Sequence, residues 1–188
     1  MLVAFFLFAT MNATQARAQW SKPRIEIGAG AGRSGLAVPP SHPLTRYGPA
    51  GIVGVHVPLY PRLYVGVDAT GWRMSEAGET SQTLFVLAST RLFFPRPDGI
   101  SAMIGLGLAR GRYASFQLPE PGDLPVVHRF AIGAGIGYEV PPGGPVSVGF
   151  YFRTMNTLGS WKQISSAPSV RRGNSVLTTG GLTLAWRR

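Results

Sequence analysis

The most constraining feature of the sequence is an alternation of apolar and small or polar residues with a period of two. Eight segments show this pattern, which is typical of strands with one buried face. Most of them reach the roughly 9–11 residues that a tilted strand needs to cross a bilayer. Glycine and β-branched residues recur within them and disfavour helices. The segments lie at about 24–33, 48–58, 62–73, 81–94, 100–112, 126–140, 145–156 and 174–187.

The connections between these segments alternate in length. Three are short and rich in turn-forming Pro and Gly, at 59–61, 95–99 and 141–144. Four are longer and polar, at about 34–47, 74–80, 113–125 and 157–173. Short turns at one end and longer loops at the other are typical of an up-and-down barrel that is inserted from one side. An even number of strands then predicts that both termini lie in the periplasm.

Each expected strand has one face of large aliphatic residues and a second face of small ones. Phe130, Ile132 and Ile136 share the first face of their segment, and glycines alternate with them on the second. For the segment at 81–94 the sequence does not decide which face points outward, because Phe85 and Leu87 make its second face apolar as well. This pattern fits either a soluble barrel with an aliphatic core or a membrane barrel with an aliphatic exterior.

Charge decides between these two barrels. A water-facing exterior needs many Lys, Glu and Asp side chains. The chain has only 8 acidic residues against 18 basic ones, and Lys occurs only at positions 22 and 162. The small-residue faces of the expected strands hold mainly Gly, Ala, Ser and Thr. The sequence therefore predicts an all-β, eight-stranded antiparallel up-and-down transmembrane β-barrel in the outer membrane of a Gram-negative-type bacterium.

The first residues predict a cleavable signal peptide. Residues 2–9 form an apolar run that is too short to span a bilayer as a helix. Ala16-Arg17-Ala18 has the small-x-small pattern of a signal-peptidase site. We expect a signal peptide at 1–18 and a single barrel domain at 19–188. The chain has no cysteine, which excludes disulfides, thiolate metal sites and a cysteine nucleophile.

The few ionisable residues on the small-residue faces predict a polar network in the lumen. An eight-stranded barrel is just wide enough for side chains to fill it, and buried charges must be paired. Counting residues along the strands places a lower group near the periplasmic end, made of Glu26, His56, Arg91 and Glu139. An upper group is expected to pair Asp68 with Arg129 or Arg153. The expected effect is a polar plug, and a narrow gated pore is the alternative. The network residues are Glu26, His56, Asp68, Arg91, Arg129, Glu139 and Arg153.

With these features the sequence resembles the OmpA/OmpX-like family of small outer-membrane barrels, over about residues 19–188. The most specific element is the last expected strand, where residues 179–186 read Thr-Gly-Gly-Leu-Thr-Leu-Ala-Trp. The resemblance implies an assembly signal, read by the barrel-assembly machinery, at Thr179, Gly181, Leu184 and Trp186. The family usually ends at the aromatic residue, whereas Arg187 and Arg188 follow here.

Arginines near the longer loops suggest contacts with phosphate-rich lipopolysaccharide, because Arg binds phosphate in bidentate fashion. The residues proposed for this contact are Arg110, Arg112, Arg171 and Arg172. Outer-membrane lipid and lipopolysaccharide are thus the expected partners of a monomeric barrel. We expect no nucleic-acid partner, no cofactor and no metal site, since three separated His residues and no acidic cluster do not form one.

Catalysis is the second alternative, because some eight-stranded outer-membrane barrels are lipid A deacylases or palmitoyltransferases. The candidate residues near the expected extracellular rim are His42, His128, Ser115 and Ser160. No acidic partner stands at a spacing that would complete a triad with them. We therefore expect no catalytic residues and a structural or surface-interaction role.

Overall fold

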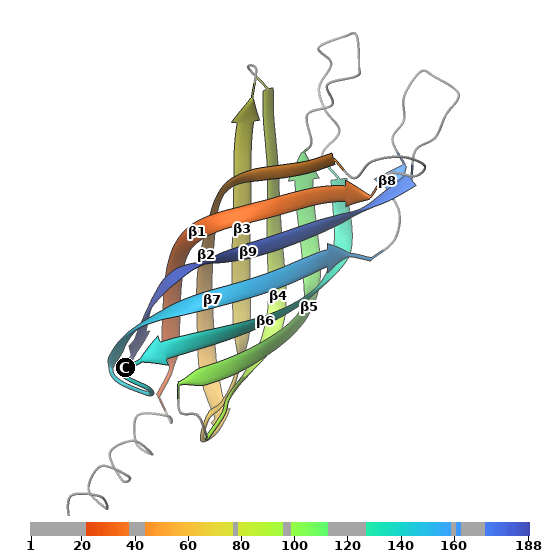
Figure 1. Cartoon of the computed structure of the whole chain (residues 1–188). Helices are drawn as coiled ribbons and strands as arrows, with labels where there is room; N and C mark the ends of the chain where they lie inside the picture. Colours follow the sequence, from red (N-terminus) through yellow and green to blue (C-terminus); the bar gives the residue numbers. More distant parts are fainter. Residues whose placement is uncertain are drawn as a thin grey trace, which may run out of the picture.

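The structure is a computed structural model, and it describes residues 22–37, 44–76, 79–95, 99–112, 127–158, 161–162 and 172–188. These residues form a closed antiparallel barrel, drawn in Figure 1. No helix in the described part of the chain is long and apolar enough to span a membrane. The barrel strands are β1 (Arg24–Ala37), β2 (Leu44–Tyr60), β3 (Leu63–Glu76), β4 (Glu79–Phe93), β5 (Ile100–Arg112), β6 (Val127–Val140), β7 (Val146–Thr157) and β9 (Arg172–Arg187).

Each barrel strand pairs with the next along the chain, and β9 pairs with β1 to close the sheet. The two-residue β8 (Trp161–Lys162) pairs with Arg172 and Gly173 at the start of β9 and is a small addition to the eight-stranded wall. The predicted all-β, eight-stranded antiparallel barrel is therefore confirmed. We call the end with the connections after β2, β4 and β6 the turn end, and the opposite end the loop end. Arg24 and Arg187 are register partners, so the first and last barrel residues both lie at the turn end.

The strands extend further toward the loop end than the sequence predicts. The expected loop at 74–80 is wrong, because β3 and β4 remain paired up to Glu76 and Glu79. Ser75 and Thr80 even share a hydrogen bond of 3.0 Å between their hydroxyl groups. A backbone ladder does not need apolar side chains, so polar residues can continue it beyond the apolar part of the wall. Connection lengths therefore do not alternate regularly around the whole barrel.

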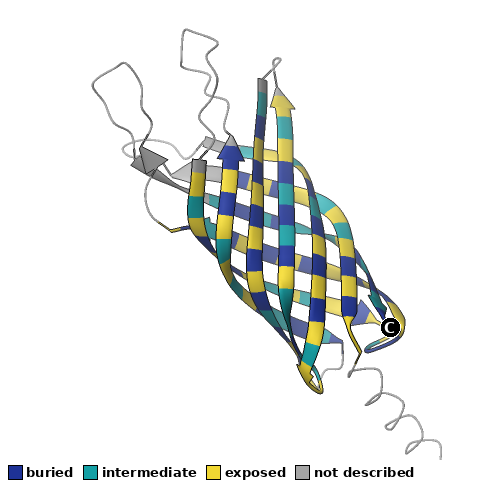
Figure 2. Cartoon of the chain, turned by 180° about the vertical axis from the view of Figure 1, so that it is seen from behind, coloured by how far each residue is buried: buried dark blue, intermediate teal, exposed yellow. Residues whose placement is uncertain are grey.

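Buried and exposed residues alternate along every strand of the wall, as the bands in Figure 2 show. Leu106 on β5 is 67% exposed and Phe130 on β6 is 72% exposed, whereas Phe85 on β4 is fully buried. This resolves the facing of β4: Leu84 and Val86 point outward, and Phe85 and Leu87 point into the barrel. The wall thus presents apolar side chains to its surroundings and keeps most ionisable ones inside.

The seam between β1 and β9 depends on two facing glycines, Gly30 and Gly181. A Cβ added to Gly181 would lie 2.2 Å from the Ala29 carbonyl oxygen and 2.6 Å from the Gly30 Cα. Both are backbone atoms, so they could give way only if the seam opened. A Cβ added to the neighbouring Gly180 would lie 3.4 Å from its nearest atom, the Tyr151 carbonyl oxygen, which is an ordinary contact distance. The fold therefore requires glycine at position 181 but not at position 180.

We predict that Gly181→Ala lowers the free energy of unfolding by about 1–3 kcal/mol, the usual cost of overpacking. Gly180→Ala is the matched control and should change it by less than about 0.5 kcal/mol. Urea titration of both variants folded in lipid vesicles, followed by tryptophan fluorescence, measures the difference. Equal losses in the two variants would contradict the account of the seam.

Candidate functional site

Eight buried ionisable side chains meet inside the barrel, and we call them the lumen charge network. They come from every barrel strand except β5, and the period-two alternation of the strands directs each of them inward. An unpaired charge in such a place would cost several kcal/mol, so each one needs a partner. The members of the network are Arg24, Glu26, His56, Asp68, Arg91, Glu139, Arg153 and Arg187.

The part of the network nearest the turn end is centred on Glu139. Its carboxylate accepts hydrogen bonds from Arg187 and, at 3.1 Å, from Arg24. The guanidinium groups of both arginines lie 5.5 Å from the centre of the Phe93 ring, within the range of cation–π attraction. The Phe93 and Tyr64 rings pack in a T-shaped arrangement, with 5.7 Å between ring centres. Two arginines, a carboxylate and an aromatic pair thus fill the lumen at this end.

In the central part of the network, two carboxylates share two arginines. Arg91 reaches Glu26 with an N–O distance of 2.8 Å and Asp68 with one of 3.7 Å. Arg153 reaches Asp68 at 3.0 Å and Glu26 at 3.4 Å. Arg24 also donates a hydrogen bond to Glu26, which joins this part to the turn-end part. The charges therefore form one connected network that crosses the lumen.

His56, Ser89 and Asp68 touch one another, but their arrangement is not that of a catalytic triad. The Nε2 atom of His56 lies 2.9 Å from the Asp68 carboxylate and 3.2 Å from the Ser89 hydroxyl. Ser89 also donates a hydrogen bond directly to Asp68 at 2.5 Å. In a triad, one ring nitrogen faces the serine and the other faces the acid. Here one nitrogen faces both and all three side chains are buried, which supports a structural role for this histidine.

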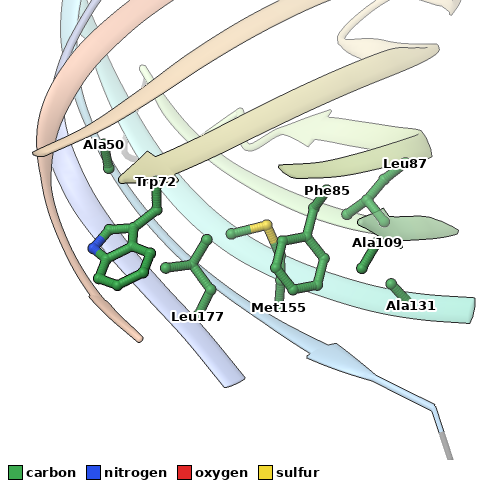
Figure 3. Close-up of a cluster of buried hydrophobic side chains, with 8 residues drawn as sticks. All are labelled: Ala50, Trp72, Phe85, Leu87, Ala109, Ala131, Met155 and Leu177. Atoms are coloured by element: carbon green, nitrogen blue, oxygen red, sulfur yellow. The ribbon is translucent and has the colours of Figure 1, made fainter. Parts of the chain in front are cut away.

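A cluster of apolar side chains crosses the lumen on the loop-end side of the network, and we call it the apolar layer (Figure 3). Phe85 and Leu177 in this layer are fully buried. Trp72 donates its indole N–H to the Gly32 carbonyl at 3.1 Å, so its single polar group is satisfied. The lumen therefore also contains an apolar layer, which was not predicted from the sequence. The members of the layer are Ala50, Trp72, Phe85, Leu87, Ala109, Ala131, Met155 and Leu177.

Two details of the predicted network differ from the structure. Asp68 does not belong to a separate upper group, because the arginines that contact it also contact Glu26. Arg129 lies two residues on the loop-end side of Ala131, beyond part of the apolar layer, and forms no ion pair with any residue that the structure describes. Counting along strands missed both because the strands of a barrel are tilted and staggered. The structure brings together Glu26, His56, Asp68, Arg91, Glu139 and Arg153.

Sequence reasoning missed Arg24 and Arg187, although the period of two places both on the inward face. Arg24 precedes Glu26 by two residues, and Arg187 follows the buried Ala185 by two. Arg24 is the first residue of β1 and Arg187 is the last of β9, so the alternation can be followed on only one side of each. Besides its ion pair, Arg187 donates a hydrogen bond to the Gly144 carbonyl at 3.0 Å. An arginine after the last aromatic residue, which departs from the usual ending of OmpA/OmpX-like barrels, thus has a place in the lumen.

The arginines predicted to meet lipopolysaccharide lie toward the loop end. Arg110 is exposed on the outward face of β5. Arg112 is the last residue of β5 and Arg172 is the first of β9. Arg171 and the predicted signal peptide at 1–18 lie outside the described residues. None of these placements tests a contact with lipid, so lipopolysaccharide binding stays a prediction.

The residues of the predicted assembly signal occupy the closing strand β9. Thr179 is buried in the lumen and Gly181 faces Gly30 across the seam. Leu184 and Trp186 are half-buried and lie on the outward face of the wall. Recognition of this strand by the assembly machinery stays a prediction, while its position at the seam is a feature of the fold.

Adjacent arginines at the end of β9 provide a matched test of the network. We predict that Arg187→Gln lowers the free energy of unfolding by about 3–5 kcal/mol, because it leaves Glu139 with too little compensating charge. The exposed Arg188 serves as the control, and Arg188→Gln should cost less than about 0.5 kcal/mol. Urea titration in lipid vesicles measures both changes, and adding Glu139→Gln to Arg187→Gln should recover part of the loss. Equal stability of the two single variants would contradict the role assigned to Arg187.

Two solved structures have a similar fold at low sequence identity. The crystal structure of Neisserial surface protein A (NspA) matches with a TM-score of 0.56 and 13% identity, over 87% of this chain and 97% of that one. Ail, the attachment invasion locus protein of Yersinia pestis, matches with a TM-score of 0.51 and 12% identity, over 86% of this chain and 99% of that one. No protein-family model and no curated protein matches the sequence. The chain therefore has the fold of small eight-stranded outer-membrane barrels such as NspA and Ail.

Proposed function

We propose that this chain is an integral outer-membrane barrel with a closed lumen and a structural or surface-interaction role. One observation carries the proposal: the large apolar side chains that are exposed come from all eight barrel strands. A partner-binding patch on a soluble protein is local and usually covers a few hundred Å². A belt that surrounds the barrel instead matches the lipid-facing band of a membrane barrel.

The two ends of the barrel support one orientation in the membrane. Outer-membrane barrels have short turns on the periplasmic side and longer connections outside. The two longest connections, from β5 to β6 and from β7 to β9, both lie at the loop end, although the connection from β3 to β4 is short there. Both ends of the described chain lie at the turn end. In the proposed orientation the turn end faces the periplasm, both termini are periplasmic, and the loop end faces outward. Insertion would then use the barrel-assembly machinery, and the barrel would act as a monomer.

The contents of the lumen support a closed barrel over a narrow pore. A permeating ion would have to separate paired charges in the lumen charge network and then cross the apolar layer. Both are costly, since buried charges without partners and ions in apolar surroundings are strongly disfavoured. The same dense filling supports a structural role over catalysis, because Ser89 and His56 are buried where a lipid substrate could not reach them.

We predict that the purified wild-type barrel gives no reproducible ion-selective openings in planar bilayers. A general porin reconstituted in the same lipid serves as the positive control for insertion and recording. Heat-modifiable migration of the reconstituted sample checks that the barrel is folded. Regular openings in the wild type that disappear in Arg91→Ala would overturn the closed lumen in favour of a gated pore.

A further inference from the structure

A groove crosses the outer wall of the barrel over strands β2 to β5, near the loop end. Its volume is about 660 Å³. Its floor includes Gly51 of β2 and Gly71 of β3, which are direct register partners. The next residue across the sheet is Leu84 of β4, which pairs with Gly71 and is 43% exposed. The floor is therefore apolar and carries no side chain at two adjacent positions.

The fold does not require glycine at these two positions. A Cβ added to Gly71 would meet no atom within 4 Å, and one added to Gly51 would meet only the Gly28 carbonyl oxygen at 3.7 Å. The inward-facing Gly66 on the same sheet is different, because its added Cβ would lie 2.0 Å from the Val55 carbonyl oxygen. The missing side chains at Gly51 and Gly71 thus leave open space on the lipid-facing surface without serving the packing of the wall.

Two exposed arginines line the same groove. Arg73 of β3 and Arg110 of β5 both point outward and form no ion pair with any residue in the described ranges. They stand on either side of β4, where Arg73 pairs with Gln82 and Arg110 pairs with Leu84. Two strand spacings and an offset of two residues put their backbones roughly 12 Å apart. Gln82 of β4, the register partner of Arg73, also lines the groove. The groove therefore combines an apolar floor with two exposed guanidinium groups and an amide.

The height of the arginines on the wall places them at a membrane interface. Arg73 follows Leu63, the first residue of β3, by ten positions. With about 3.3 Å per residue and a tilt of about 35–45°, this corresponds to roughly 25 Å above the turn end. The apolar band of such barrels is also about 25 Å tall. In the proposed orientation, Arg73 and Arg110 lie at the level of lipid headgroups in the outer leaflet, with the glycine floor beside the acyl chains.

We propose that this groove binds lipid A, with one acyl chain over Gly51, Gly71 and Leu84 and the phosphates at Arg73 and Arg110. The proposal rests on the proposed location of the barrel in the outer membrane and assigns one site on its wall. Arg binds phosphate with paired, charge-assisted hydrogen bonds. A ligand with two separated phosphates matches two separated arginines better than a phospholipid with one phosphate does. Charge complementarity therefore favours lipid A as the occupant.

The test is native mass spectrometry of the folded, full-length barrel in detergent, titrated separately with bisphosphorylated lipid A, dephosphorylated lipid A and phosphatidylglycerol. The wild type should bind bisphosphorylated lipid A at the lowest concentration. The double variant Arg73→Gln/Arg110→Gln should weaken this binding at least about tenfold and remove the preference for phosphate, because charge-assisted hydrogen bonds are lost. Gly71→Leu should weaken both forms of lipid A, because it fills the floor of the groove.

Matched controls keep the outcome specific. Ala69→Leu adds the same side chain on the same outward face of β3, outside the groove, and Arg188→Gln removes an exposed charge at the turn end. Neither control should change lipid A binding by more than about twofold. Equal binding of all variants, or tighter binding of phosphatidylglycerol, would overturn the groove as a lipid A site and leave the proposed function standing. A wild-type chain absent from the outer-membrane fraction of the host would overturn both.

Discussion

The pairing of β1 with β9 is the interaction on which the rest of the structure depends. In a bilayer, every backbone N–H and C=O group needs a partner within the protein, and a sheet meets this need only when it closes on itself. Closure removes both sheet edges, and it forces the backbones together on the concave inner face. The facing pair Gly30 and Gly181 allows that approach. Aliphatic side chains can then turn outward on every strand, because no edge or gap interrupts the wall.

Closure with eight strands also determines what the lumen can contain. Such a barrel has room for side chains and little else, so the charges of the lumen charge network are buried and find their partners across the lumen. The arginines Arg91 and Arg153 solve this by bridging Glu26 and Asp68. On the loop-end side, the apolar layer packs without charged partners. The closed lumen that we propose follows from these two layers in series, because an ion would have to cross both.

Much of this fold is predictable from the sequence, because the period of two assigns each residue to one face of a strand. The facing of β4 is not, since Phe85 and Leu87 make both of its faces apolar and only the closed barrel puts them in the lumen. Contacts across the lumen are predictable only in part. Counting along strands allows the observed pair of Asp68 with Arg153, but not the bridges from Arg91 and Arg153 to Glu26 that join the two expected groups. Those bridges depend on strand stagger, which a count along single strands does not contain. The groove at Gly71 could not be predicted from the sequence, because the sequence alone does not show which glycines the packing of the wall requires.

The central claim is that the apolar belt faces lipid and that the paired ions are enclosed by the barrel. Fractionation of a Gram-negative host that expresses the full chain tests this most directly, with boiled and unboiled outer-membrane samples compared on SDS gels. The account predicts that the chain is found in the outer-membrane fraction and that the unboiled barrel migrates differently from the boiled, unfolded chain. A chain that is recovered as a soluble periplasmic protein would contradict the account.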